Sequence, residues 1–368
     1  NKANLEKSRS GVYLERYQDR VISVQSVGFE PVFDITVDES HSFIANGIVV
    51  HNCTEITLPT SPMGNEDSLI ALCTLSAINW GKFTPFGALD SESSVPARQE
   101  NKLREACEMA VRGLDALLDY QEYPVDAAYR HSMRYRPLGI GIIGFAHWLA
   151  KGRLYWGETD TLVEVEAMME KMAYYLTETS INLAKEFGSI PVKTKYHEGI
   201  FPIDTSILKA KTQMDWDLLR AKAKQYGIRN ATLMALMPSE TSSQLSNETN
   251  GIEPPRDMVS IKGSKEGVLP QIVPDYNKLA ASYQTLWQVK TDEYLRTTAV
   301  LQKYIDQAIS LNTSYDPSKY VDGIKMSDLI KDLLLAYKLG HKTLYYCNTR
   351  DGSGDEADDG CDSGACKI

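Results

Sequence analysis

Apolar runs alternate with segments of helical periodicity along most of this chain, from about residue 54 to residue 347. Apolar runs of strand length lie at residues 69–75, 138–145, 231–237 and 342–347. Helical spacing of apolar residues covers residues 96–118, 161–187, 215–225, 291–310 and 327–338. Gly188 is expected to end the second helix and Ser327 to cap the last one. Alternation of this kind predicts an α/β fold with a largely parallel sheet.

The first 52 residues follow a different pattern. Residues 1–20 are polar and charged without a clear apolar period, whereas residues 21–24, 32–37 and 47–50 are β-type runs separated by turn residues. An all-β piece this small does not bury a core alone, so it needs a complementary partner. A boundary is therefore expected near residue 52.

Composition excludes several classes of function. A net charge of -10 argues against a general nucleic-acid binder, because no basic patch would offset phosphate repulsion. No apolar run is long enough to span a membrane, and no secretory leader is evident. Six cysteines in 368 residues do not make a disulfide scaffold, and in a cytoplasmic protein they more often do redox chemistry. We expect a cytoplasmic enzyme that binds neither nucleic acid nor membrane.

Three reactive groups meet at the peptide bond between residues 52 and 53. The thiol of Cys53 can take over an upstream thioester. The carboxamide of Asn52 can attack its own carbonyl carbon and break the bond, while His51 can protonate that carbonyl or the leaving amine. The alternative is a buried strand with an incidental His-Asn pair. The order and spacing of the whole run from residue 32 to residue 53 favour splicing chemistry.

That run resembles the C-terminal end of an intein. The resemblance implies that Asp34 tunes the transesterification and that His41 assists cyclisation of Asn52. No stretch resembles the N-terminal half of an intein, so the chain is expected not to splice alone. It is either the C-terminal partner of a split intein or part of a longer precursor, and both alternatives stay open. Residues 1–52 are accordingly predicted to be a small all-β (Hint-type) intein segment.

The remainder of the chain carries five ordered motifs. They are Cys53-Thr54-Glu55-Ile56-Thr57-Leu58-Pro59, Ala71-Leu72-Cys73-Thr74-Leu75, Pro238-Ser239-Glu240-Thr241-Ser242-Ser243-Gln244 continuing to residues 250–255, Thr343-Leu344-Tyr345-Tyr346-Cys347-Asn348-Thr349-Arg350, and Cys361-Asp362-Ser363-Gly364-Ala365-Cys366. Together they resemble the C-terminal half of class I (aerobic) ribonucleotide reductase large subunits. The resemblance implies that residues 53–350 form the second half of a ten-stranded α/β barrel and that residues 351–368 form a flexible redox tail.

The resemblance assigns the radical chemistry to Cys53 and Glu55. A thiyl radical at Cys53 would abstract the ribose 3′ hydrogen, and Glu55 would accept the proton of the 3′-hydroxyl. Two residues apart in an extended segment, these side chains face the same way. Standing alone, Glu55 would be an ordinary glutamate on the surface of a strand.

Further roles follow from the same resemblance. Cys73, which by itself would be a small core residue, would be one of two reducing thiols whose partner lies upstream. The loop residues Pro238, Ser239, Glu240, Thr241 and Ser242 would bind the substrate diphosphate, although such a cluster alone predicts a helix cap.

The tyrosine pair and the terminal cysteines complete the implied site. Tyr345 and Tyr346, otherwise a packing pair, would relay a radical from the small (beta) subunit. Cys361 and Cys366 would reduce the active-site disulfide and pass electrons to thioredoxin or glutaredoxin. A zinc site is the competing interpretation, but the tail lacks two further ligands.

The resemblance also implies partners and cofactors. No cofactor or metal is expected on this chain, which would depend on the metal and tyrosyl radical of the small subunit, with ATP and dNTP effectors bound upstream. An alpha2 homodimer with beta2 and an N-terminal partner part are expected. The competing hypotheses are a splicing element whose attached segment is only cargo and a degenerate remnant; five intact motifs argue against the remnant.

Overall fold

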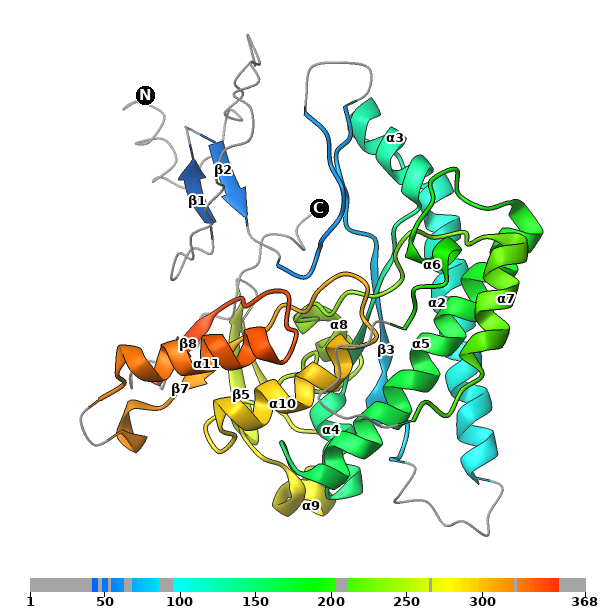
Figure 1. The fold of residues 1–368 in the computed structure, drawn as a ribbon. Helices are drawn as coiled ribbons and strands as arrows, with labels where there is room; N and C mark the ends of the chain where they lie inside the picture. The colour runs from blue at the N-terminus through cyan, green and yellow to red at the C-terminus, as the bar shows by residue number, and fades with distance from the viewer. Residues whose placement is uncertain are drawn as a thin grey trace.

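The computed structural model describes residues 42–45, 48–51, 54–62, 68–85, 95–202, 211–264, 267–320 and 323–350. Figure 1 shows a mixture of helices and short strands in this part of the chain, with the long helices α2 and α5 side by side. The β-type runs expected at residues 21–24 and 32–37, and the tail at 351–368, lie outside the described residues. Within the described residues, no helix is long and apolar enough to cross a membrane.

The strands pair two by two. They are β1 (Ser42–Ala45), β2 (Ile48–His51), β3 (Leu75–Asn79), β4 (Gly139–Ile143), β5 (Val259–Ser264), β6 (Gly267–Ile272), β7 (Thr313–Tyr315) and β8 (Cys347–Thr349). Hairpins β1–β2 and β5–β6 are antiparallel, whereas β3–β4 and β7–β8 are parallel. The described strands form four two-stranded sheets and no closed barrel, so this part of the chain is a mixed α/β structure. The expected half of a ten-stranded barrel is seen only in part: the assigned strands pair two by two, and hydrogen-bonded extended segments at residues 231–237 and 306–310 continue the parallel layer beyond β4.

The helices lie mainly between β3 and β7. They are α2 (Val95–Tyr120), α3 (Asp126–Tyr135), α4 (Phe145–Gly152), α5 (Thr159–Phe187), α6 (Lys195–Glu198), α7 (Trp216–Tyr226), α8 (Glu240–Leu245), α9 (Tyr276–Leu279), α10 (Thr291–Gln302) and α11 (Met326–Lys338). The predictions for residues 96–118, 161–187, 215–225 and 327–338 are confirmed within two residues at each end. Gly188 ends α5 as expected, but α11 starts before Ser327, with Lys325 at its N-cap position.

The core forms where α5 packs against its neighbours. Most of α5 is buried, and its contacts with α2, α7 and α10 enclose apolar side chains from all four helices. Burying these faces is the main driving force for folding. Beside β3 and β4, the rings of Trp80, Phe145 and Trp148 pack with centroids 5.1–6.1 Å apart. Gly144 joins β4 to α4 with φ +72, where a Cβ atom would lie 2.7 Å from the amide nitrogen of Gly81.

The parallel layer continues beyond β4 through two extended segments. Residues 231–237, predicted as a strand, are extended: the carbonyls of Thr232 and Leu233 accept from the amides of Leu138 and Ile140 at 3.0 and 2.8 Å. On its other side this segment meets residues 308–310, with a parallel bridge between Leu236 and Ile309. The helix predicted over 291–310 is therefore wrong beyond Gln302, because residues 306–310 form extended pairings instead.

Two strand predictions had wrong bounds. Within residues 69–75, Leu69 makes only an isolated bridge to Ser61, and the paired strand β3 starts at Leu75. Residues 75–79 are the ones that pair with β4, in parallel register from Leu75 opposite Gly139 to Asn79 opposite Ile143. A strand was expected at residues 342–347, but the assigned strand β8 begins only at Cys347. Tyr345 and Tyr346, just before it, already form backbone hydrogen bonds to the segment that leads into β7.

Candidate functional site

One extended segment, residues 306–312, connects the predicted site residues. The carbonyl of Ala308 accepts from the amide of Leu236 at 3.1 Å, and the amide of Ala308 donates to the carbonyl of Glu55 at 2.9 Å. The carboxamide of Gln307 accepts from the amide of Thr57 at 3.3 Å and donates to the carbonyl of Leu138 at 2.9 Å. The first motif is thereby fixed beside the parallel layer. We call residues 306–312 the site strand.

Glu55 is buried beside this strand. Glu55 is only 1% exposed, and the hydroxyl of Ser310 donates a hydrogen bond to its carboxylate. Burial raises the pKa of Glu55, while the Ser310 hydroxyl and the backbone amide of Glu55 lower it. A carboxyl group of this kind, raised in pKa yet hydrogen-bonded, suits proton transfer.

Cys73 lies close enough to Glu55 to feel its charge. The residue is exposed, but crowding by protein atoms and then the negative charge of Glu55 raise the pKa of its thiol to about 11. At neutral pH the thiol is therefore protonated, which is the form that can supply a hydrogen atom or a proton. The apolar run alone predicts that Cys73 is a buried core residue, but in the structure Cys73 is exposed.

This arrangement predicts the reactivity of Cys73. Because only the thiolate reacts, iodoacetamide alkylation of Cys73 should rise about tenfold per pH unit between about pH 7.5 and 9.5. Glu55→Gln removes the negative charge and should speed the reaction at every pH. Peptide mass spectrometry measures the rate, with the exposed Cys347 as internal reference. A rate that levels off below about pH 9 would contradict the assignment.

The predicted diphosphate loop follows the extended segment 231–237. Ser239 adopts a left-handed conformation with φ 57 and precedes α8, which starts at Glu240. The first amides of α8 have no acceptor within their own helix. The hydroxyl of Ser242 donates to the carbonyl of Ser239 at 3.2 Å. The loop thus presents hydroxyl and amide groups two residues after Leu236, whose backbone is bonded to the site strand.

Buried groups hold the far end of this loop. Glu248 is 1% exposed, accepts from Nδ1 of His147 at 2.7 Å and lies 3.3 Å from Nζ of Lys82. Gly251 packs directly on the loop, since a Cβ atom there would lie 2.8 Å from the carbonyl oxygen of Pro238. Any larger residue at position 251 would push the loop away.

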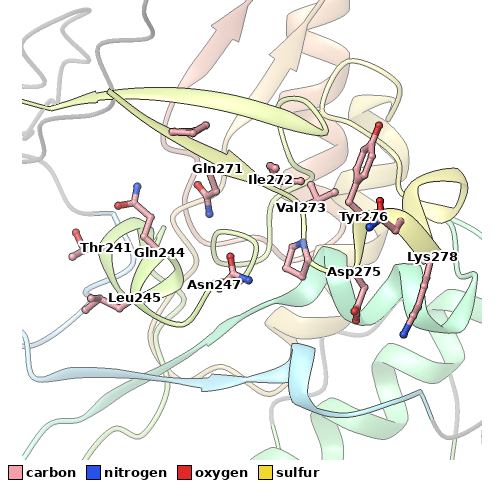
Figure 2. A pocket seen from close by; sticks show the side chains of 13 residues that line it. Thr241, Gln244, Leu245, Asn247, Gln271, Ile272, Val273, Asp275, Tyr276 and Lys278 are labelled. Atoms are coloured by element: carbon pink, nitrogen blue, oxygen red, sulfur yellow. The ribbon is translucent and has the colours of Figure 1, made fainter. Parts of the chain in front are cut away.

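A pocket of about 770 Å³ opens beside α8. Figure 2 shows Thr241, Gln244 and Leu245 on one wall, with residues of β6 and α9 across from them. Of the five residues predicted to bind diphosphate, Thr241 is the one that lines this pocket. Glu55 and the tyrosine pair do not line it, so this pocket is not the meeting point of the predicted chemistry.

Tyr345 and Tyr346 lie against the end of the site strand. Their ring centroids are 3.7 Å apart, and the hydroxyl of Tyr346 donates to that of Tyr345 at 2.6 Å. The amide of Tyr345 donates to Leu311, and the carbonyl of Tyr346 accepts from Thr313, each at 2.8 Å. Two phenols in direct hydrogen-bond contact can exchange a proton and an electron in one step.

Asn312 ties the tyrosine pair to the loop that ends the third motif. Its carboxamide oxygen accepts from the amide of Tyr346 at 3.0 Å, and its Nδ2 donates to the carboxylate of Glu253. The site strand therefore reaches Glu55 through Ser310 and reaches Tyr346 through Asn312, two residues apart.

Several predicted residues fall outside the described part of the chain. These are Asp34, His41, Asn52, Cys53, Cys361 and Cys366. His51 is described only as the last residue of β2. Among the described residues, no group of three or more His, Cys, Asp or Glu side chains is placed to hold a metal ion.

Comparison with known families decides the classification. The family model described as "Ribonucleotide reductase, barrel domain" matches residues 31–347. This chain belongs to the ribonucleotide reductase barrel family. The match begins upstream of the boundary expected at residue 52.

Proteins similar to this chain are named as alpha subunits of ribonucleoside-diphosphate reductases. The ribonucleoside-diphosphate reductase subunit alpha of Haemophilus influenzae is 48% identical over 332 residues, which cover 86% of this chain and 42% of that subunit. The Escherichia coli reductase 1 subunit alpha is 51% identical over 269 residues, covering 68% of this chain and 35% of that subunit. The subunit of Enterobacteria phage T4 is 39% identical over 333 residues, covering 86% and 42%. The chain thus spans less than half the length of these relatives.

Sequence reasoning missed the residues that support this candidate site. The predicted helix over residues 291–310 included Gln307 and Ser310 and ended just before Asn312. In the structure this helix, α10, ends at Gln302. No local pattern marks these three residues, because Ser310 lies 255 positions from Glu55 in sequence. The one available signal was that the predicted strand at residues 231–237 needs a parallel neighbour, a place that residues 306–310 take in the structure.

Proposed function

We propose that this chain is part of a ribonucleoside-diphosphate reductase alpha subunit, which reduces ribonucleoside diphosphates to 2′-deoxyribonucleoside diphosphates for DNA replication. The observation that carries the proposal is that Glu55 and the tyrosine pair are both hydrogen-bonded to the site strand, while Cys73 lies close enough to Glu55 for that charge to raise the pKa of its thiol, in a member of this family. In this proposal the activity belongs to the complete subunit, of which the chain supplies the second part.

Each proposed step has a residue to perform it. A thiyl radical at Cys53 takes the 3′ hydrogen of the ribose, and Glu55 accepts the proton of the 3′-hydroxyl. Cys73, with an upstream partner, supplies the reducing equivalents as the 2′-hydroxyl is replaced by hydrogen and a disulfide forms. Cys361 and Cys366 then reduce that disulfide by thiol exchange, and thioredoxin or glutaredoxin restores them.

The radical enters through the tyrosine pair. In this proposal Tyr345 and Tyr346 pass it from the small subunit toward Cys53, and their hydroxyl contact of 2.6 Å supports the relay. The small subunit supplies the metal and the tyrosyl radical, and the assembly is an alpha2 dimer with beta2 in the cytoplasm. Residues 238–242 bind the substrate diphosphate through amides and hydroxyls.

We propose protein splicing as a second function, located at the start of the chain. The hairpin β1–β2 ends at His51, directly before the predicted junction between Asn52 and Cys53, as a strand that presents a splice site would. Cys53 would first accept the upstream segment and later carry the radical. A thiol is a good nucleophile for thioester capture, and thiyl formation requires a sulfur atom at this position.

Mass spectrometry tests the splicing proposal. On incubation with its upstream partner, the chain is expected to lose residues 1–52 and to be joined through Cys53. Cys53→Ala should block the joining because alanine offers no nucleophile. Nucleotide reduction should appear only after joining. A product that still carries residues 1–52 after incubation would defeat the proposal.

A further inference from the structure

Ser310 has a backbone that is fixed independently of its side chain. Its amide donates to the carbonyl of Leu236 at 3.0 Å as part of the parallel layer. The residue is 4% exposed, and its hydroxyl donates to Glu55 and lies 3.2 Å from the hydroxyl of Thr54. The side chain is therefore aimed at the carboxylate, whereas the strand would form with many other residues at this position.

The environment of Glu55 makes this hydroxyl important. Burial opposes the ionised carboxylate and raises the pKa of Glu55. The groups that lower this pKa are the Ser310 hydroxyl and the amide of Glu55 itself, so none of the described cations contributes. A base must be ionised before it can accept a proton. A donor to the carboxylate thus favours the form that the reaction needs.

We propose that Ser310 is a positioning residue for Glu55, whose hydroxyl holds the carboxylate ionised and in one orientation for accepting the substrate proton. The inference rests on the proposed reductase function. During the reaction the proton of the 3′-hydroxyl moves to a carboxylate oxygen of Glu55. Ser310 keeps its own proton throughout and acts on the substrate only through Glu55, to whose carboxylate it donates.

The test is the pH profile of kcat in the complete reductase, measured in the steady state with the small subunit and a dithiol reductant present. Ser310→Ala removes the donor, so the acidic limb should move to higher pH. The loss of kcat should reach about tenfold on that limb, the effect of one hydrogen bond to a charged group, and should shrink on the alkaline side. KM should not change, because Ser310 does not bind the substrate.

Two further variants keep the test decisive if Ser310→Ala does not fold. Ser310→Thr retains the hydroxyl and should restore the wild-type profile. Ser310→Cys is close in size but a weaker donor, so its acidic limb should lie between those of the wild type and of alanine. Ser314→Ala, on β7 just beyond the site strand, is the matched control and should leave the profile unchanged.

The outcomes separate the two proposals. Wild-type profiles for both Ser310→Ala and Ser310→Cys would overturn the role of Ser310. An equal loss of kcat at every pH would do the same, since it would indicate a merely structural contribution. Full activity of Glu55→Gln would instead refute the role of Glu55 in the proposed function.

Discussion

Glu55→Gln is expected to lower nucleotide reduction by the complete enzyme by at least about 100-fold, the lower end of what a positioned base contributes. Glutamine has nearly the size of glutamate and can still accept the hydrogen bond of Ser310, but it cannot take up a proton. The measurement is the conversion of a ribonucleoside diphosphate to its deoxy form. Glu198→Gln, an exposed glutamate on α6, is the matched control.

The loss of activity should occur without a loss of stability. The pKa of Glu55 is raised in the folded protein, so its ionised form disfavours folding, and the stability it contributes falls as pH rises above 4.5 through the folded pKa. At pH 8 a neutral glutamine should therefore leave the unfolding midpoint equal or higher. An inactive variant that is also clearly less stable would point to a structural role for Glu55 instead.

Long helices and short ordered motifs were predictable from the sequence for physical reasons. The helices α2 and α5 carry apolar residues at helical spacing over 26 and 29 residues, a period that few other structures satisfy. Glu55, Cys73 and the tyrosine pair were proposed as site residues because their ordered motifs resemble a known family. The local pattern alone would have predicted a surface glutamate, a core cysteine and a packing pair.

The site strand was not predictable in this way. Its apolar residues fit the end of a helix as well as a buried strand, and periodicity does not separate the two over so few residues. The segment is extended because its backbone forms hydrogen bonds to Leu236 and Glu55, which lie far away in sequence. The polar residues that hold the site, Ser310 and Asn312, are common types whose role appears only once their partners are placed.

Asp306 is expected to be among the most costly side chains to remove, because it joins the site strand to the segment that leads to the diphosphate loop. Its carboxylate accepts from the amides of Leu233 and Met234 at 2.6 and 2.9 Å. It also accepts from the hydroxyl of Tyr196 at 2.7 Å and from the amide of Gln307 at 2.9 Å. Four donors on one carboxylate fix both segments in register.

Asp306→Ala leaves these donors without their acceptor, and the free energy of unfolding should fall by roughly 3–5 kcal/mol. Asp306→Asn keeps one oxygen that can accept and should lie between alanine and the wild type. Asp217→Ala is the matched control: its side chain is 94% exposed and, within the described residues, pairs with Arg220 three positions on, so the change should stay within about 0.5 kcal/mol.

Urea denaturation of the chain, followed by circular dichroism, measures these changes through the midpoint at constant slope. If Asp306→Ala lost less than about 1 kcal/mol, water would have to replace the carboxylate at the donors that it now satisfies. The two segments would then be held by their backbone ladder alone. In that case the position of Glu55 would depend on Ala308 and Ser310, and Asp306→Ala should leave nucleotide reduction intact. A large loss of stability together with lost activity would instead show that the register set by Asp306 is what brings the proton acceptor and the diphosphate loop into one site.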